Sequence, residues 1–205
     1  MLKPARRACG PVNAIVLCGG KSSRMGFDKA FIKAGGRTLV ERQVEALSGR
    51  FRKIILATNS PEKYSLPRRV EKVADAVPGL GPLGGLASAL ERSDLRYNFT
   101  VACDMPFVSP DLAAYMAGSI KNGYQAVVPF YRGEYQPLCA VYSRDCLGEI
   151  REALARKRLK IVRLFSRLKV RKVPLRELKE FGDPDIYFRN INTPGDLRFL
   201  SSFER

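Results

Sequence analysis

A loop rich in glycine and cations follows a short apolar run near the start of the chain. The run is Ala14–Cys18, and residues 19–29 continue as GGKSSRMGFDK. The adjacent glycines, Gly19 and Gly20, let the backbone approach a ligand closely, and exposed amides beside cations bind phosphate oxygens. The cations of this loop are Lys21, Arg24 and Lys29. The loop lacks the Gly-Lys-Ser/Thr ending of a Walker A motif. It predicts a polyphosphate site of another kind, and a flexible basic surface loop is the alternative.

A second glycine cluster, PGLGPLGG, occupies residues 78–85. Gly79, Gly81 and Gly84 match Gly-x-Gly-x-x-Gly, the fingerprint of dinucleotide-binding Rossmann domains. That fingerprint normally lies in the first strand-to-helix turn, which here belongs to the earlier glycine loop. We therefore interpret the cluster as bare backbone on which a nucleotide base or sugar packs, with Gly81 as a binding candidate. An NAD site and a plain turn are the alternatives.

Two carboxylates each follow an expected strand. Asp104 comes after Phe99–Cys103, and Asp75 comes after residues 70–74. Magnesium prefers one or two carboxylates and fills its other positions with water and substrate phosphate. Asp104 is thus the predicted Mg²⁺ ligand, and Asp75 is predicted to accept hydrogen bonds from a base or to hold a sugar. Capping of the following turn is the alternative role for each.

Two asparagines near the end of the chain are weaker candidates. Asn190 and Asn192 flank Ile191, so both amides fall on one face of an extended segment. Carboxamide oxygens can ligate Mg²⁺ or face a phosphate. The next residues, Thr193 and Pro194, also form an ordinary helix start.

The composition removes several classes of enzyme. The 205 residues include no histidine, which excludes Ser-His and Cys-His catalysis and His-ligated zinc. The five cysteines contain no Cys-x-x-Cys pair, which argues against structural zinc and a disulfide framework. We expect a reducing cytoplasm as the compartment, and no apolar stretch approaches the roughly 20 residues of a spanning helix.

The net charge of +16 is concentrated in one block. Residues 151–179 hold twelve Lys or Arg and two Glu, a local excess of +10. Such a block is either a solvated face or a docking surface for an acidic partner. Nucleic acid is a disfavoured partner, because the chain has no aromatic-studded basic strand, zinc module or helix-turn-helix signal.

Apolar periodicity predicts an α/β fold with a mostly parallel sheet. We expect residues 1–205 to form a single three-layer domain with a Rossmann-like sheet, after a loose basic N-terminus at 1–12. The expected strands are 14–17, 53–58, 70–74, 99–103, 125–129 and 137–142. The expected helices are 38–47, 82–90, 110–120, 145–156 and 194–203. Residues 186–192 are expected as a final strand or extended loop. Ligands of such sheets bind beyond the carboxyl ends of the strands, where the segments above lie.

Four motifs in order resemble the MobA family of molybdenum cofactor guanylyltransferases. They are LxGGxSxRMGxDK at 17–29, GPLGGL at 81–86, CDMPF at 103–107 and NINTPxDL at 190–197. The first motif alone resembles the wider nucleotidyltransferase superfamily, and the resemblance covers nearly the whole chain. It implies a fold of the nucleotide-diphospho-sugar transferase type. It also implies Mg²⁺-dependent transfer of GMP from GTP to the terminal phosphate of molybdopterin cofactor, with release of pyrophosphate.

The resemblance also implies roles for individual residues. Leu17, Cys18 and Gly19 would line the nucleotide with backbone groups, Lys29 would contact phosphate, Asp75 would contact the nucleotide, and Asp104 would bind nucleotide and Mg²⁺. Gly20, Lys21 and Gly81 complete the predicted nucleotide site, and the predicted catalytic residues are Arg24, Lys29 and Asp104. Molybdoenzyme apoproteins or cofactor-delivery proteins are further candidate partners. A cytidylyltransferase, or a guanylyltransferase of another cofactor pathway, is the nearest alternative.

Overall fold

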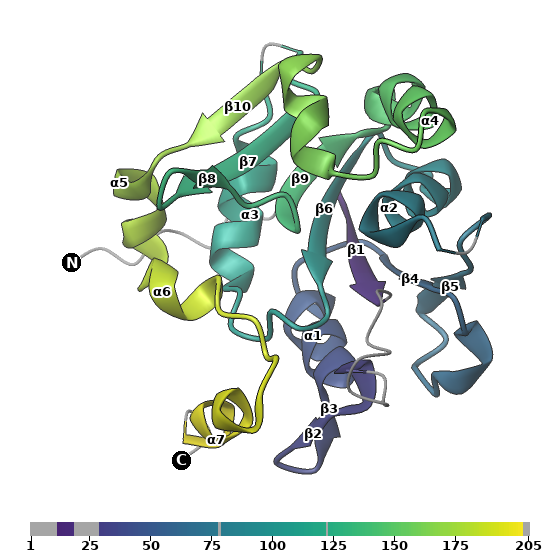
Figure 1. The fold of residues 1–205 in the computed structure, drawn as a ribbon. Coiled ribbons are helices and arrows are strands. Elements are labelled where there is room, and N and C mark those ends of the chain that lie inside the picture. Colours follow the sequence, from purple (N-terminus) through teal and green to yellow (C-terminus); the bar gives the residue numbers. More distant parts are fainter. Residues whose placement is uncertain (1–11, 19–28, 78, 122, 203–205) are drawn as a thin grey trace.

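A computed structural model describes residues 12–18, 29–77, 79–121 and 123–202. Within these ranges, eight strands form one sheet in the order β10-β7-β9-β6-β1-β4-β5, with β8 paired to β7 (Figure 1). The strands are β1 (Asn13–Cys18), β4 (Ile54–Thr58), β5 (Val70–Val73), β6 (Tyr97–Ala102), β7 (Ala126–Tyr131), β8 (Glu134–Tyr135), β9 (Cys139–Ser143) and β10 (Val170–Val173).

Most neighbouring strands of the sheet are parallel, as predicted. β5, β4, β1 and β6 run side by side in one direction, and β10 is parallel to β7. The exception is β9, which lies antiparallel between β6 and β7. The six predicted strands are all present, whereas β8 and β10 were not predicted.

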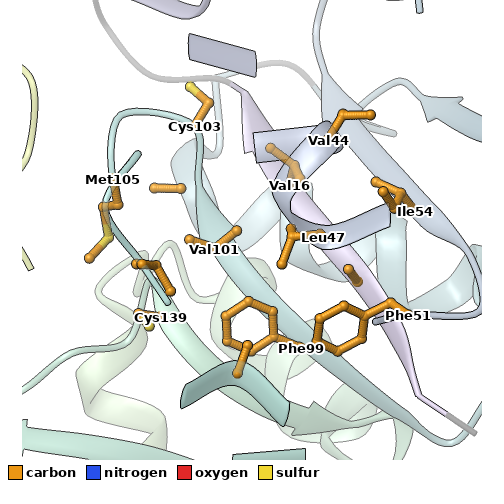
Figure 2. Packing of buried hydrophobic residues seen from close by; sticks show 14 of the residues in the cluster. Val16, Val44, Leu47, Phe51, Ile54, Phe99, Val101, Cys103, Met105 and Cys139 are labelled. Carbon is orange, nitrogen blue, oxygen red and sulfur yellow. The ribbon is translucent and has the colours of Figure 1, made fainter. Parts of the chain in front are cut away.

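Helices cover both faces of the sheet and complete three layers. The longer helices are α1 (Leu39–Ser48), α2 (Gly81–Arg92), α3 (Pro110–Gly118), α4 (Leu147–Ala155) and α7 (Pro194–Ser202). Side chains alternate along β1, so that Val16 packs with α1 and α3 while Ile15 packs with α2 and α4. On the first face, Phe51 and Phe99 stack with ring centroids 5.5 Å apart, below Val44 and Leu47 of α1 (Figure 2).

A local signal fixes the start of α1. The Thr38 side chain accepts a hydrogen bond from the Glu41 amide at 3.2 Å, and the Glu41 carboxylate accepts one from the Thr38 amide at 2.7 Å. This reciprocal capping box confirms the predicted helix start.

A third, smaller core joins the end of the chain to its N-terminal third. The hairpin of β2 (Lys33–Ala34) and β3 (Arg37–Thr38) lies beside α7 (Figure 1). Ala34, Leu39, Ile191 and Leu200 form the buried contact. The C-terminal segment is thereby held at the end of the sheet where β1 and β6 finish.

The segment before α7 corrects one prediction. Residues 186–192 were expected to be extended, but Ile186 and Tyr187 belong to the short helix α6 (Pro184–Tyr187). Asp183 caps this helix by accepting a hydrogen bond from the Asp185 amide at 2.9 Å, and Pro184 takes its first position. Only the residues from Phe188 to Thr193 are irregular.

The basic block contains more regular structure than its composition indicated. Besides the end of α4, it holds a 3-10 helix at Ile161–Ser166, the edge strand β10 and the short helix α5 (Leu175–Leu178). Residues 1–11 of the predicted loose N-terminus lie outside the described ranges, whereas Val12 is buried. In the part of the chain that the structure describes, no helix has both the length and the apolar character needed to cross a membrane.

Candidate nucleotide site

The two predicted carboxylates, Asp75 and Asp104, follow the same row of paired residues at one edge of the sheet. Val73, Ala57, Leu17 and Ala102 form one row across β5, β4, β1 and β6. Asp75 follows Val73 by two positions, and Asp104 follows Ala102 by two. The Cys103 amide donates to the Leu17 carbonyl at 3.1 Å and extends the ladder to the residue before Asp104. Both carboxylates therefore begin at the carboxyl edge of the sheet, on opposite sides of β1.

Asp75 lies against bare backbone at the start of α2. A methyl group on Gly85 would be 3.2 Å from Oδ1 of Asp75 and 3.5 Å from the side chains of both Ala57 and Leu17. On Gly84 it would be 2.8 Å from Cβ of Leu80. These positions accept only glycine without displacement, so the backbone of the second glycine cluster packs directly against Asp75 and the end of β1.

The same helix start offers unmatched amides. The residue before α2, Leu80, provides no side-chain cap, and the helix opens at Gly81 with φ of +64°. That left-handed conformation favours glycine. An uncapped helix N-terminus carries partial positive charge and free N–H donors, which suit an anion or a polarised base edge.

Burial raises the pKa of Asp75 above its usual value. The fold therefore disfavours the ionised carboxylate. The cost in stability builds up as the pH rises from the unfolded pKa to the raised folded pKa, and it is constant above that. We expect Asp75→Asn to raise Tm at neutral pH by about 2–4 °C while weakening nucleotide binding about tenfold or more. The Tm gain should vanish near about pH 3, where both folded and unfolded Asp75 are protonated.

Thermal melts across pH and nucleotide titrations of the same protein measure both effects. Glu62→Gln, an exposed carboxylate in the 3-10 turn after β4, is the matched control and should change neither quantity. A variant with lower Tm and full nucleotide affinity would contradict this account of Asp75.

The C-terminal segment approaches Asp104 directly. The Ile191 amide donates to the Asp104 carbonyl at 2.8 Å, and the Ile191 side chain is fully buried. Asn190 and Asn192 are exposed on either side of it. The structure thus brings the predicted asparagines to the loop of the predicted metal ligand, a contact between residues far apart in the sequence.

Asp196 fixes the loop that carries these asparagines. Its carboxylate accepts hydrogen bonds from the Asn192 amide at 3.1 Å, the Thr193 amide at 3.0 Å and the Thr193 hydroxyl at 2.8 Å. Arg189 donates to its other oxygen at 3.0 Å. Burial alone would raise the pKa of Asp196, but these bonds outweigh it and lower the pKa to about 2. In the amino-acid sequence Asp196 is recognisable only as the aspartate of the NINTPxDL motif.

We expect Asp196→Ala to lower kcat/KM about tenfold, since a 1 Å misplacement of a site loop has effects of this order or larger, and to destabilise the fold by about 1 kcal/mol. The stabilising effect of the lowered pKa is present above the unfolded pKa of about 3.9 and is lost as the pH falls through 2. In the wild type, Asp196 is therefore fully ionised at ordinary assay pH, and its hydrogen bonds to the loop do not vary with pH.

The matched control is Asp145→Ala. Asp145 also pairs with an arginine, accepting from Nε of Arg96 at 2.9 Å, but it begins at the opposite edge of the sheet, after β9. Steady-state kinetics and denaturant unfolding separate the two effects. The Asp196 variant could instead lose as much stability as the control and keep full kcat/KM. That result would show that the hydrogen bonds of Asp196 do not position the site.

The donor set near Asp104 fits magnesium more than a softer metal. Among the described residues, no group of three His, Cys, Asp or Glu side chains is placed to hold a metal ion. One carboxylate with two exposed carboxamides on the adjoining loop matches the few protein ligands that Mg²⁺ takes when phosphates and water complete its shell. Asp104 is the residue that would hold it, with Asn190 and Asn192 as further oxygen donors.

Several predicted site residues fall in the loop after β1. Gly19, Gly20, Lys21 and Arg24 lie outside the described residues. Lys29 opens the 3-10 turn Lys29–Phe31. This turn is anchored by Ala30, which is fully buried, and by Phe31, which stacks on Tyr64 at 4.7 Å. Leu17 and Cys18 are buried at the end of β1. Leu17 belongs to the row of paired residues that precedes the two carboxylates, and Cys18 follows it.

Known proteins are similar to this chain in both sequence and fold. A probable molybdenum cofactor guanylyltransferase of Pelotomaculum thermopropionicum is 35% identical over 89% of this chain and 88% of its own length. A molybdenum cofactor guanylyltransferase of Syntrophotalea carbinolica is 32% identical over 90% of this chain and 88% of its own.

Solved structures agree with these relatives. Molybdopterin-guanine dinucleotide biosynthesis protein A of Archaeoglobus fulgidus superposes with a TM-score of 0.82 at 29% identity, covering 94% of this chain and 98% of that one. A Thermus thermophilus 2-C-methyl-D-erythritol 4-phosphate cytidylyltransferase shares the fold at 20% identity, with a TM-score of 0.67 over 95% of this chain and 98% of its own. The family model of the MobA-like NTP transferase domain matches residues 14–172. With its sheet, its glycine-lined edge and these relatives, the chain belongs to the MobA-like NTP transferase family.

Proposed function

We propose that this protein transfers GMP from GTP to the terminal phosphate of molybdopterin cofactor, releasing pyrophosphate and forming molybdopterin guanine dinucleotide. The relatives named as molybdenum cofactor guanylyltransferases support the reaction. The observation that carries it is the row of strand ends from which Asp75 and Asp104 emerge on opposite sides of β1. In this proposal Asp75 binds the base, and Asp104 lies at the phosphates.

The surroundings of Asp75 favour guanine. Guanine presents two adjacent donors, the ring N1–H and the exocyclic amine, and one carboxylate can accept both. Cytosine presents one amine beside an acceptor nitrogen, which a carboxylate would repel. Gly84 and Gly85 place bare backbone directly against Asp75 and Leu80, because any side chain there would meet Asp75 or Leu80. Loss of a paired donor at a buried polar group costs about 1–3 kcal/mol.

The reaction needs positioning and charge neutralisation more than proton transfer. The attacking phosphate oxygen of the acceptor is largely ionised at pH 7, so the absence of histidine is no handicap. The cations Lys21, Arg24 and Lys29 would offset the repulsion between two anions and stabilise charge on the leaving pyrophosphate. When bound at Asp104, Mg²⁺ supplies further positive charge at the reacting phosphates. The residues around Ile191 close the acceptor side of the site.

Pyrophosphate release tests the proposal. The protein is incubated with Mg²⁺ and each of the four nucleoside triphosphates, with and without molybdopterin cofactor. We expect release only with GTP and the cofactor together. Release with CTP and the cofactor would make the protein a cytidylyltransferase, and release with GTP but only with a different acceptor would assign it to another cofactor pathway. Omitting Mg²⁺ from the productive mixture tests the metal requirement separately.

A further inference from the structure

We propose that a pocket at the end of α4 is a second anion site, which binds a small phosphate compound independently of the nucleotide site. The pocket has a volume of about 280 Å³. Four arginines line it together with one hydroxyl and two apolar side chains. These residues are Ala153, Arg156, Arg158, Arg163, Leu164, Ser166 and Arg167. None of them belongs to the candidate nucleotide site, so the proposal does not rest on the proposed function.

Only two of the four arginines in this pocket form ion pairs with carboxylates. Arg156 pairs with Glu152 at 2.8 Å, and Arg167 pairs with Glu149 at 2.8 Å and Glu152 at 2.7 Å. Arg158 and Arg163 make no ion pair within the ranges that the structure describes. Two guanidinium groups without a paired carboxylate repel each other, and an anion between them removes that repulsion.

The backbone fixes where the unpaired arginines lie. α4 ends at Ala155, and Lys157 just beyond it has φ of +53°, in the left-handed region where glycine is the usual residue. This turn allows the Arg158 amide to donate to the Ala153 carbonyl at 2.8 Å, which sets Arg158 over the end of the helix. The 3-10 helix Ile161–Ser166 then presents Arg163 and Ser166 three residues apart, on one side.

The lining identifies the class of ligand. Guanidinium groups bind phosphate through two parallel N–H donors. The Ser166 hydroxyl donates to the Arg163 carbonyl at 3.2 Å, so the arginines supply the donors of the pocket. Buried Ala153 and Leu164 form an apolar floor, which strengthens charged interactions above it. A concave pocket of this size fits a small phosphate ester or pyrophosphate better than a protein surface, which needs a broader area.

The pocket is also distant in the fold from the nucleotide site. Figure 1 shows α4 near the top of the molecule, whereas β1 and β6 point their carboxyl ends downward. An anion bound at the end of α4 would therefore not occupy the candidate nucleotide site at the carboxyl edge of the sheet. The pocket accounts for four of the cations in the 151–179 block, for which the nucleotide site gives no role.

Calorimetric titration of the full chain with pyrophosphate, inorganic phosphate and glycerol 3-phosphate tests the site. We expect Arg158→Gln/Arg163→Gln to weaken the binding of pyrophosphate about tenfold or more or to remove one binding event. The control is Arg68→Gln/Arg69→Gln, which removes two exposed arginines before β5 and should match the wild type. The three ligands distinguish free phosphate from a phosphate ester as the natural source.

Equal pyrophosphate binding by the wild type, the Arg158/Arg163 variant and the control would overturn the proposal. Binding of a hexaglutamate peptide but not of pyrophosphate, lost in the same variant, would also overturn it and assign the pocket to an acidic protein. Ser166→Asp provides an independent test, because it adds a negative charge to the pocket without removing an arginine. We expect this variant to lose the same binding event and to keep the melting temperature of the wild type.

Discussion

Replacing Asp104 with alanine is expected to abolish nucleotidyl transfer, with a fall in kcat of roughly 10³-fold or more. The carboxylate lies where the ladder of β1 and β6 ends, and it is the predicted ligand for Mg²⁺. Its removal takes away the anion that would hold the metal beside the phosphates. The measurement is pyrophosphate release at a large excess of Mg²⁺, so that weakened metal binding alone is compensated.

The fold should survive this change. Asp104 receives the Ile191 hydrogen bond through its carbonyl oxygen, which every residue possesses. Asp111→Ala is the matched control, because Asp111 lies seven positions further on and pairs with Arg50 at the start of α3. The control should retain nearly wild-type turnover. Near-normal transfer by the Asp104 variant would remove the basis for placing the metal there.

Lys29→Ala is expected to lower kcat/KM by roughly 10²-fold or more. Lys29 is the predicted contact to the triphosphate at the end of the glycine loop, and its charge would offset the approach of a second anion. Its backbone is held by the turn that buries Ala30 and stacks Phe31 on Tyr64, so the substitution removes a cation from a supported position. Higher salt should narrow the difference between the variant and the wild type, because salt screens the lost charge.

Lys63→Ala tests whether loss of any nearby cation has the same effect. Lys63 ends the 3-10 turn Pro61–Lys63 and is exposed. Its replacement should leave kcat/KM within about twofold of the wild type, as expected for a solvated surface charge. A Lys29 variant no slower than this control would assign phosphate binding to other residues.

Three of the strands that carry the site, β1, β4 and β6, were predictable because they are buried on both faces. Continuous apolar runs such as Ala14–Cys18 and Phe99–Cys103 are typical of strands covered by helices on both sides, and a polar residue directly after them must lie at a sheet edge. The row joining Val73, Ala57, Leu17 and Ala102 follows once the strands pair in parallel. The positions of Asp75 and Asp104 at one edge are thus accessible from the sequence.

Other features have no such local signal. The antiparallel direction of β9 cannot be inferred from its apolar pattern, which is the same in either direction. Strand β10, Val170–Val173, holds two adjacent cations between its valines inside a basic block, so it lacks the alternation of apolar and polar residues that indicates a strand. The helix at Pro184–Tyr187 was recognisable from Asp183 and Pro184, a capping residue followed by proline, and it was missed. The contact of Ile191 with Asp104 depends on the third core, which only the assembled fold reveals.

That third core has a consequence for how the protein is made. A chain leaves the ribosome from its N-terminus, and domains generally begin to fold as they emerge. The strands β1, β4, β5 and β6 and the hairpin β2–β3 all precede residue 103. The residues that pack on the hairpin, Ile191 and Leu200, come near the end of the chain, and Ile191 also bonds to Asp104. A nascent chain can therefore pair these strands while the segment that bonds to the Asp104 loop is still missing, and that contact forms only when the last part of the chain has been synthesised.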